Sequence, residues 1–307
     1  MFAKRANLKR LSPSILSIPR QIRDRLSFGL TGKVPDRRNI KIFDDDLLLV
    51  SYPKSGNTWV RLMCASLLGG KLPVDLLQME KIIPTIYYLS PKRLDGLQRP
   101  RYLKSHEYLN PAYKKVLYIV RDPRDVCVSY YHFHRRGKRI SKDYPIVDYI
   151  PWFVKGGPDH FGTWGDHVGG WVGARNGNRD FLCVRYEDLQ SDTLSSLRAI
   201  SKFLERDLDE SKLAAIIRNC TSSRMRILEA QAGTAWIDGV KSDIPFVRAA
   251  RSGSWVEDLP PESTKLITDA WGPVMSRLGY ELDLNRPSSL DLFSSSDSDQ
   301  EGVLDKA

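Results

Sequence analysis

Short apolar runs alternate with longer segments of helical spacing along most of this chain. Apolar runs of four to eight residues bounded by turn residues are typical of buried strands. They predict strands at 46–52, 116–120 and 181–186, and a shorter strand at 103–106. Because strands that alternate with helices favour parallel pairing through crossover helices, we expect an α/β fold with a central parallel β-sheet flanked by helices.

Helical spacing of apolar residues predicts helices at 56–68, 123–133, 193–204, 212–218 and 263–278. Asp122 can cap the second of these helices, because Pro123 suits the first helical position and a carboxylate accepts hydrogen bonds from the first turn. Gly69 and Gly70 are expected to end the first helix. We find no internal repeat and no linker between residues 42 and 285, so we expect this range to form one domain.

The charge is unevenly distributed along the 307 residues, whose formal net charge is +10. Residues 1–41 contain eleven Lys or Arg and two acidic residues, whereas residues 286–307 contain two basic residues, five acidic residues and several serines. The basic arm has the composition of an organelle transit peptide, or of a solvated arm. The acidic tail has too little apolar surface to repay ordering, so we expect disorder there. Nucleic acid is not an expected partner, because the body between these ends is only mildly basic; we expect it to bind a small anion.

The chain contains four cysteines, which lie far apart and show no spacing typical of a zinc site or a redox motif. We therefore expect reduced thiols in an intracellular compartment and no metal. No apolar run approaches the roughly 18 residues that a membrane-spanning helix needs, so no transmembrane segment is expected. A cytoplasmic location is expected, and organelle targeting by the basic arm is the alternative.

The most informative stretch is residues 52–59, Tyr-Pro-Lys-Ser-Gly-Asn-Thr-Trp, between a predicted strand and a predicted helix. The start of a helix offers unpaired N–H groups and a positive dipole end to an anion, and Gly56 lets the backbone approach that anion closely. Lys54 adds a full positive charge. Three short polar side chains complete the loop: Ser55, Asn57 and Thr58. The stretch predicts a P-loop-like phosphate-binding loop, although its lysine precedes its single glycine, unlike the common phosphate loop. An ordinary tight turn is the alternative.

This loop resembles the Pro-Lys-Ser-Gly-Thr-Thr-Trp signature of sulfotransferases that use 3′-phosphoadenosine 5′-phosphosulfate (PAPS), with Asn57 in place of the first threonine. A second stretch, Tyr-Ile-Val-Arg-Asp-Pro-Arg-Asp-Val-Cys-Val-Ser-Tyr-Tyr-His-Phe at 118–133, resembles the 3′-phosphate motif of the same family. Weaker matches occur at 103–106, 160–164, 185–188 and 246–255. The resemblance covers roughly residues 45–280, leaving the arm and the tail outside a sulfotransferase domain at 42–285.

The resemblance implies an enzyme that moves a sulfuryl group from PAPS, its donor substrate, to a hydroxyl or amine of a small-molecule acceptor, without a metal. His106 matches the general base of the family, and Lys54 and Lys104 match its catalytic lysines. Sulfuryl transfer, like phosphoryl transfer, depends mainly on positioning and charge stabilisation, which suits these residue types.

The same resemblance implies a set of donor contacts. The phosphosulfate would lie on the loop residues Lys54, Ser55, Gly56, Asn57, Thr58 and Trp59. Arg121 and Ser129 would bind the 3′-phosphate, with Arg248 near them. Trp59, Tyr186 and Thr221 would contact the adenine.

Besides Asn57, three departures from the family pattern qualify this prediction. The family's Arg-Lys-Gly triplet is Arg-Ala-Ala at 248–250, and Arg251 is the candidate to compensate. Ser223 stands where cytosolic members often place an aromatic residue against the adenine. Pro260 and Pro261 occupy the family's short dimer motif, so we expect a monomer, or a dimer through another surface.

Two other functions remain open from the sequence. A nucleotide kinase on a similar fold is one, although the missing Gly-Lys-Ser/Thr order counts against it. A non-enzymatic nucleotide-binding protein is the other: the altered triplet after Arg248 allows it, whereas Lys54, Lys104 and His106 disfavour it.

Overall fold

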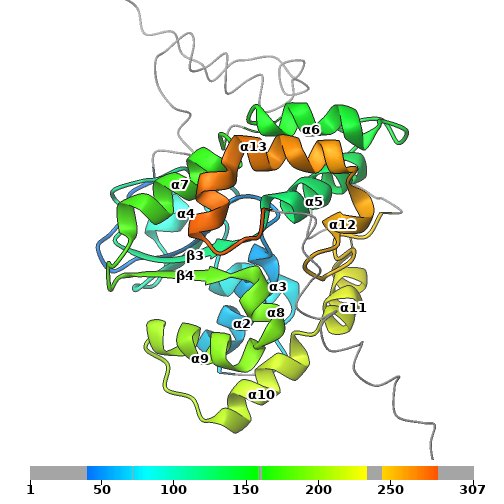
Figure 1. Ribbon diagram of the computed structural model, residues 1–307. Coiled ribbons are helices and arrows are strands. Elements are labelled where there is room, and N and C mark those ends of the chain that lie inside the picture. The colour runs from blue at the N-terminus through cyan, green and yellow to red at the C-terminus, as the bar shows by residue number, and fades with distance from the viewer. Residues whose placement is uncertain (1–39, 71, 158, 160, 234–243, 283–307) are drawn as a thin grey trace, which may run out of the picture.

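The structure is a computed structural model that describes residues 40–70, 72–157, 159, 161–233 and 244–282 (Figure 1). The acidic tail and the basic arm, apart from residues 40 and 41, lie outside the described residues. The expected disorder of the tail and the expected targeting by the arm concern these same residues and stay predictions.

In the described part of the chain, four parallel strands form the central sheet, in the order β2-β1-β3-β4. Their bounds are β1 Leu47–Ser51, β2 Tyr102–Ser105, β3 Lys115–Val120 and β4 Phe181–Arg185. The predicted α/β class and all four predicted strands are confirmed. The predicted strand 181–186 is one residue too long, because β4 ends at Arg185 and Tyr186 is the first residue of a helix.

Helices cover both faces of the sheet (Figure 1). Their bounds are α2 Asn57–Gly69, α3 Leu76–Ile82, α4 Pro91–Asp95, α5 Pro123–Arg136, α6 Ile146–Val154, α7 Trp164–Arg175, α8 Tyr186–Ser191, α9 Thr193–Phe203, α10 Glu210–Asn219, α11 Ser222–Ala232, α12 Trp255–Asp258 and α13 Pro261–Arg277. Figure 1 shows α2, α3, α9 and α10 on one side of the sheet and α5, α6, α7 and α13 on the other.

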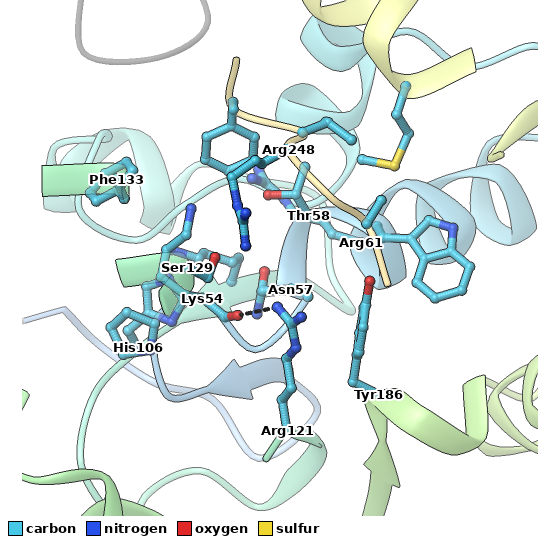
Figure 2. A pocket seen from close by; sticks show the side chains of 18 of the residues that line it. Lys54, Asn57, Thr58, Arg61, His106, Arg121, Ser129, Phe133, Tyr186 and Arg248 are labelled. Atoms are coloured by element: carbon cyan, nitrogen blue, oxygen red, sulfur yellow. Dashed lines mark hydrogen bonds between the residues drawn. The ribbon is translucent and has the colours of Figure 1, made fainter. Parts of the chain in front are cut away.

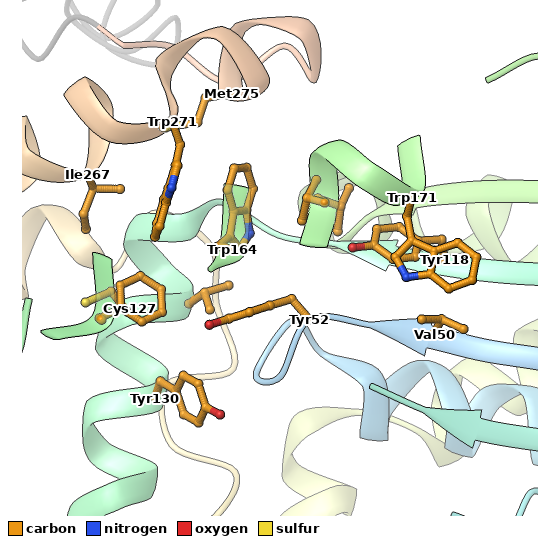
Figure 3. Packing of buried hydrophobic residues seen from close by; sticks show 14 of the residues in the cluster. Val50, Tyr52, Tyr118, Cys127, Tyr130, Trp164, Trp171, Ile267, Trp271 and Met275 are labelled. Carbon is orange, nitrogen blue, oxygen red and sulfur yellow. The ribbon is translucent and has the colours of Figure 1, made fainter. Parts of the chain in front are cut away.

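The alternation of side chains along each strand divides the interior into two cores. Leu47 and Leu49 of β1 pack with α2, α9 and α10, whereas Leu48 and Val50 pack against α5, α6 and α7. In the second core Trp164, Trp171, Trp271 and other large aromatic side chains lie over the strands (Figure 3). The two central strands, β1 and β3, are thus buried on both faces, which explains why their sequences are almost continuously apolar.

Two helix ends are formed by the capping residues that the sequence predicted. The Asp122 side chain accepts a hydrogen bond from the N–H of Arg124, and Pro123 is the first residue of α5, as predicted. Gly70 has φ of 68°, the left-handed conformation that ends many helices, and it caps α2. The predicted end of α5 near Phe133 is wrong by three residues, because the helix continues to Arg136.

Among the described residues, seven helices were not predicted from the sequence: α3, α4, α6, α7, α8, α11 and α12. Several are too short to show helical periodicity, and α6 contains Pro151, a residue that normally interrupts a helix. A signal was available for α3, where Asp75 and Gln78 form a capping box.

The cysteines are free thiols, as expected. Among the described residues, no helix is both long enough and apolar enough to cross a membrane.

Candidate active site

The carboxyl ends of the four strands bring the predicted functional residues to one edge of the sheet. The loop containing Lys54 follows β1, and β2, β3 and β4 are followed directly by His106, Arg121 and Tyr186. In parallel sheets, ligands bind outside the carboxyl ends of the strands. A cavity of about 740 Å³ opens at this edge (Figure 2).

All but one of the predicted site residues line this cavity: Lys54, Gly56, Asn57, Thr58, Trp59, Lys104, His106, Arg121, Ser129, Tyr186, Thr221 and Arg248. The exception is Ser55, whose side chain is fully buried and does not line the cavity. Its Oγ has no hydrogen-bond partner among the described residues. The sequence therefore predicted where the cavity lies, but Ser55 does not belong to its wall.

Gly56 is required at its position for two reasons. Its φ is 88°, a left-handed conformation that side chains disfavour, and a Cβ atom there would lie 2.3 Å from Cδ2 of Tyr186. Gly56 also precedes α2 as its N-cap, without a side-chain cap. The first N–H groups of α2 have no acceptor within the helix, so they can bind an anion in the cavity.

Lys54 occupies a strained position beside two aromatic rings that the sequence analysis missed. Its φ is 69°, which is uncommon for a residue with a side chain. Its Nζ lies 4.4 Å from the ring centroid of Phe133 and 4.1 Å from that of Phe246. These are cation–π distances, and the rings come from α5 and from the segment after α11. Together they hold the ammonium group at the cavity wall.

His106 is held in one tautomer by its hydrogen bonds. Its Nδ1 lies 2.7 Å from the carbonyl oxygen of Ser51, which can only accept, so Nδ1 carries the proton in the neutral ring. The lone pair is then on Nε2. Burial and the neighbouring Lys104 ammonium hold the pKa of His106 well below its ordinary value. The ring is therefore neutral at pH 7, the state that a general base requires.

Asn57, where the family pattern has threonine, connects the loop to this histidine. Its Nδ2 donates to Oγ of Ser51 at 3.2 Å, and that oxygen lies 3.3 Å from Nδ1 of His106. Asn57 itself is buried. The substitution thus adds a side-chain link between the phosphate loop and the predicted base.

Arg121 bridges two segments of the cavity wall. Its Nη1 donates to the carbonyl of Lys54 at 3.4 Å, drawn in Figure 2, and its Nη2 donates to the carbonyl of Arg251 at 2.9 Å. Its guanidinium lies 4.5 Å from the ring centroid of Tyr186. Nε is buried without a hydrogen-bond partner among the described residues. These contacts fix the guanidinium at the cavity, where an anion could bind it.

The predicted adenine contacts have mixed roles. Trp59 lines the cavity, packs edge-on against Tyr186 and donates from Nε1 to the carbonyl of Cys220 at 2.8 Å. The Thr221 hydroxyl caps α11 by accepting from the N–H of Arg224 at 3.2 Å. Ser223 is not part of the wall, whereas Met225 is.

Arg248 lines the cavity and pairs with Asp258 at 3.2 Å. Arg251 does not line it, because its guanidinium pairs with Glu257 on the exposed side. Arg251 contributes its carbonyl group to the site instead, as the acceptor for Arg121.

The opposite wall of the cavity consists of residues that the sequence analysis did not select. Phe161 lies edge-on to His106, with ring centroids 5.7 Å apart. Asp159 accepts hydrogen bonds from Tyr130 and from Arg139. Burial alone would raise the pKa of Asp159, but His134, Tyr130 and Arg139 hold it below its ordinary value. Asp159 is therefore an anion neutralised by its neighbours. Phe161 and Tyr130 lie in stretches that resemble the family, but no role was predicted for them, and Asp159 lies outside those stretches. These side chains meet only in the folded chain.

Within the residues that the structure describes, no group of three or more side chains could hold a metal ion.

Comparison with known proteins agrees with this geometry. The family model described as the sulfotransferase domain matches residues 44–279. Sulfotransferase 2A1 of Macaca fascicularis is 28% identical over 81% of this chain and 90% of its own length. Sulfotransferase 1 family member D1 of Rattus norvegicus is 30% identical over 69% of this chain and 77% of its own length.

Solved structures show the same fold. The crystal structure of mouse sulfotransferase SULT7A1 complexed with PAP has a TM-score of 0.64 and 26% identity, covering 78% of this chain and 87% of the other. Retinol dehydratase in complex with androsterone and inactive cofactor PAP has a TM-score of 0.66 and 19% identity, covering 86% and 88%. With the family match over most of the chain and the phosphate loop at the strand ends, this chain belongs to the sulfotransferase family and is a PAPS-dependent sulfotransferase.

Proposed function

We propose that this enzyme transfers the sulfuryl group of PAPS to a hydroxyl or amine of a small-molecule acceptor, with His106 as the general base. The observation that carries the proposal is the tautomer of His106. Its Nδ1 proton is directed to the Ser51 carbonyl, so that Nε2 holds the lone pair beside the phosphate loop. A relative named amine sulfotransferase in Oryctolagus cuniculus, 28% identical over 74% of this chain, supports amines among the acceptors.

In the proposed reaction the acceptor attacks sulfur while its proton moves to Nε2 of His106. The new bond to sulfur forms as the bond between sulfur and the bridging phosphate oxygen breaks. Lys54 and Lys104 would stabilise the negative charge that develops on this oxygen. A positioned donor or cation of this kind is typically worth about 3–4 kcal/mol in the transition state.

The donor would bind with its phosphosulfate on the loop before α2. There the unpaired N–H groups and Lys54 supply positive charge. Its 3′-phosphate would contact Arg121, Ser129 and Arg248. Mouse SULT7A1, with PAP (3′,5′-adenosine bisphosphate) bound, supports the same donor here.

The test is the variant His106→Ala, with His132→Ala as the matched control. His132 lies on α5 and does not line the cavity. We expect His106→Ala to keep its affinity for PAP but to lose most of its transfer of labelled sulfate, since a general base contributes about 10²- to 10⁴-fold. The control should transfer sulfate at the wild-type rate. Undiminished transfer by His106→Ala would refute the assignment.

Two further properties are proposed with this function. The enzyme is a monomer, or a dimer through a surface other than the family's short contact, because prolines occupy that contact. It acts in the cytoplasm unless the basic arm directs it to an organelle.

A further inference from the structure

The segment 246–255, here called the strap, crosses the donor side of the cavity and has no regular secondary structure before α12. Side chains of other helices bind its backbone instead. Glu229 accepts from the N–H groups of Phe246 and Val247, and Gln190 binds the carbonyl of Ala250 and the N–H of Ser252. The position of the strap therefore depends on a few side chains.

Asp125 makes the largest set of contacts near the carboxyl end of the strap. It lies in the first turn of α5 and is 1% exposed. Oδ2 accepts from the N–H of Gly253 at 2.7 Å, and Oδ1 accepts from Ser254 Oγ and the N–H of Trp255, both at 3.1 Å. Hydrogen bonds to a buried carboxylate are stronger than neutral ones, and losing one leaves a buried group unpaired.

The strap also connects Asp125 to the two arginines of the proposed donor site. Arg248 belongs to the strap, and Arg121 donates to the strap carbonyl of Arg251 at 2.9 Å. Asp125 and Arg121 are themselves 3.7 Å apart, farther than any of the strap contacts of Asp125. The Asp125 carboxylate therefore binds mainly to the strap. The strap in turn binds the guanidinium of Arg121 through the carbonyl of Arg251.

We propose that Asp125 is a positioning residue for the donor, which acts by fixing the strap so that Arg121 and Arg248 face the 3′-phosphate together. This inference rests on the proposed function of those two arginines. Burial raises the pKa of Asp125, but its hydrogen bonds favour the charged form. Loss of the Asp125 charge would by itself have the opposite effect on affinity. A carboxylate near a phosphate repels it, so removing only the charge would strengthen PAP binding.

The experiment is calorimetric titration with PAP of the variants Asp125→Asn and Asp46→Asn. Asp46 is the matched control. It is fully buried and accepts from an arginine and a backbone N–H, at 2.8 Å each, yet it lies outside the cavity wall. In Asp125→Asn the new amide NH2 would face the N–H of Gly253 and could not accept its hydrogen bond. The strap would then be held less firmly, and we expect PAP to bind about tenfold more weakly. Asp46→Asn should lower the melting temperature and leave the affinity unchanged.

The affinity for PAP is the readout that a merely structural role would not move, and hydrogen exchange tests whether the strap loosens. The amides of Gly253 and Trp255 should exchange faster in Asp125→Asn and not in Asp46→Asn. If Asp125→Asn does not fold, the milder Ser254→Ala removes one of the three contacts and should weaken PAP about threefold.

The outcomes separate this inference from the proposed function. If Arg121→Ala and Arg248→Ala bind PAP as tightly as the wild type, the assignment of the arginines is wrong. If these variants bind weakly and Asp125→Asn does not, only the role of Asp125 is wrong. Tighter binding by Asp125→Asn, or an equal loss in Asp46→Asn, would also overturn that role.

Discussion

The substitution Gly56→Ala tests the geometry of the phosphate loop most directly. The new methyl group would lie 2.3 Å from Cδ2 and 2.7 Å from Cε2 of Tyr186, and the backbone φ of 88° would carry a side chain. Holding such a residue in a left-handed conformation costs about 1–2 kcal/mol, and overpacking a buried site costs about 1–3 kcal/mol. We therefore expect a loss of about 2–5 kcal/mol in the free energy of unfolding.

The substitution should also weaken donor binding, because Tyr186 cannot move independently of its neighbours. Its ring packs on Trp59, at 5.7 Å between centroids, and lies beneath the guanidinium of Arg121 at 4.5 Å. Urea unfolding and calorimetric titration with PAP would measure the two losses. The double variant Gly56→Ala/Tyr186→Ala should remove the steric part of the effect and keep the backbone part, so its two substitutions should not be additive. A Gly56→Ala protein with wild-type stability and wild-type affinity for PAP would refute the reasoning.

The remaining predictions concern charge and the ends of the chain. Arg121→Ala should weaken PAP binding by about 1.5–3 kcal/mol, the usual value of a charged hydrogen bond, whereas Lys54→Ala should mainly lower turnover; calorimetry showing unchanged affinity in Arg121→Ala would contradict the first. Lys104→Met removes a cation that depresses the pKa of His106. The loss of kcat/KM on acidification should then begin at higher pH than in the wild type, and a profile moved to lower pH would show the wrong sign. Deleting residues 1–40 should leave turnover on a small acceptor unchanged, and a folded truncation that no longer binds the donor would disprove this.

The sequence by itself predicted the parallel sheet and the loop at its edge, and all but one of the residues that it selected for the site line the cavity. These features are local. The loop 52–59 is one continuous stretch, and the helix start at Asp122 follows from neighbouring residues. The central strands β1 and β3 were recognisable because they are buried on both faces, which leaves a run of apolar residues in each.

Only the tertiary structure determined how these residues act on one another. The rings around Lys54 come from Phe133 and Phe246, and the proton on Nδ1 of His106 is directed by a strand 55 residues earlier. Asp125 meets the strap across 128 to 130 positions of sequence. Such contacts leave no periodicity or spacing in the sequence, because they depend on the order of strands in the sheet and on the crossing of the helices over it. Single side chains, and not a repeated backbone pattern, hold these segments together.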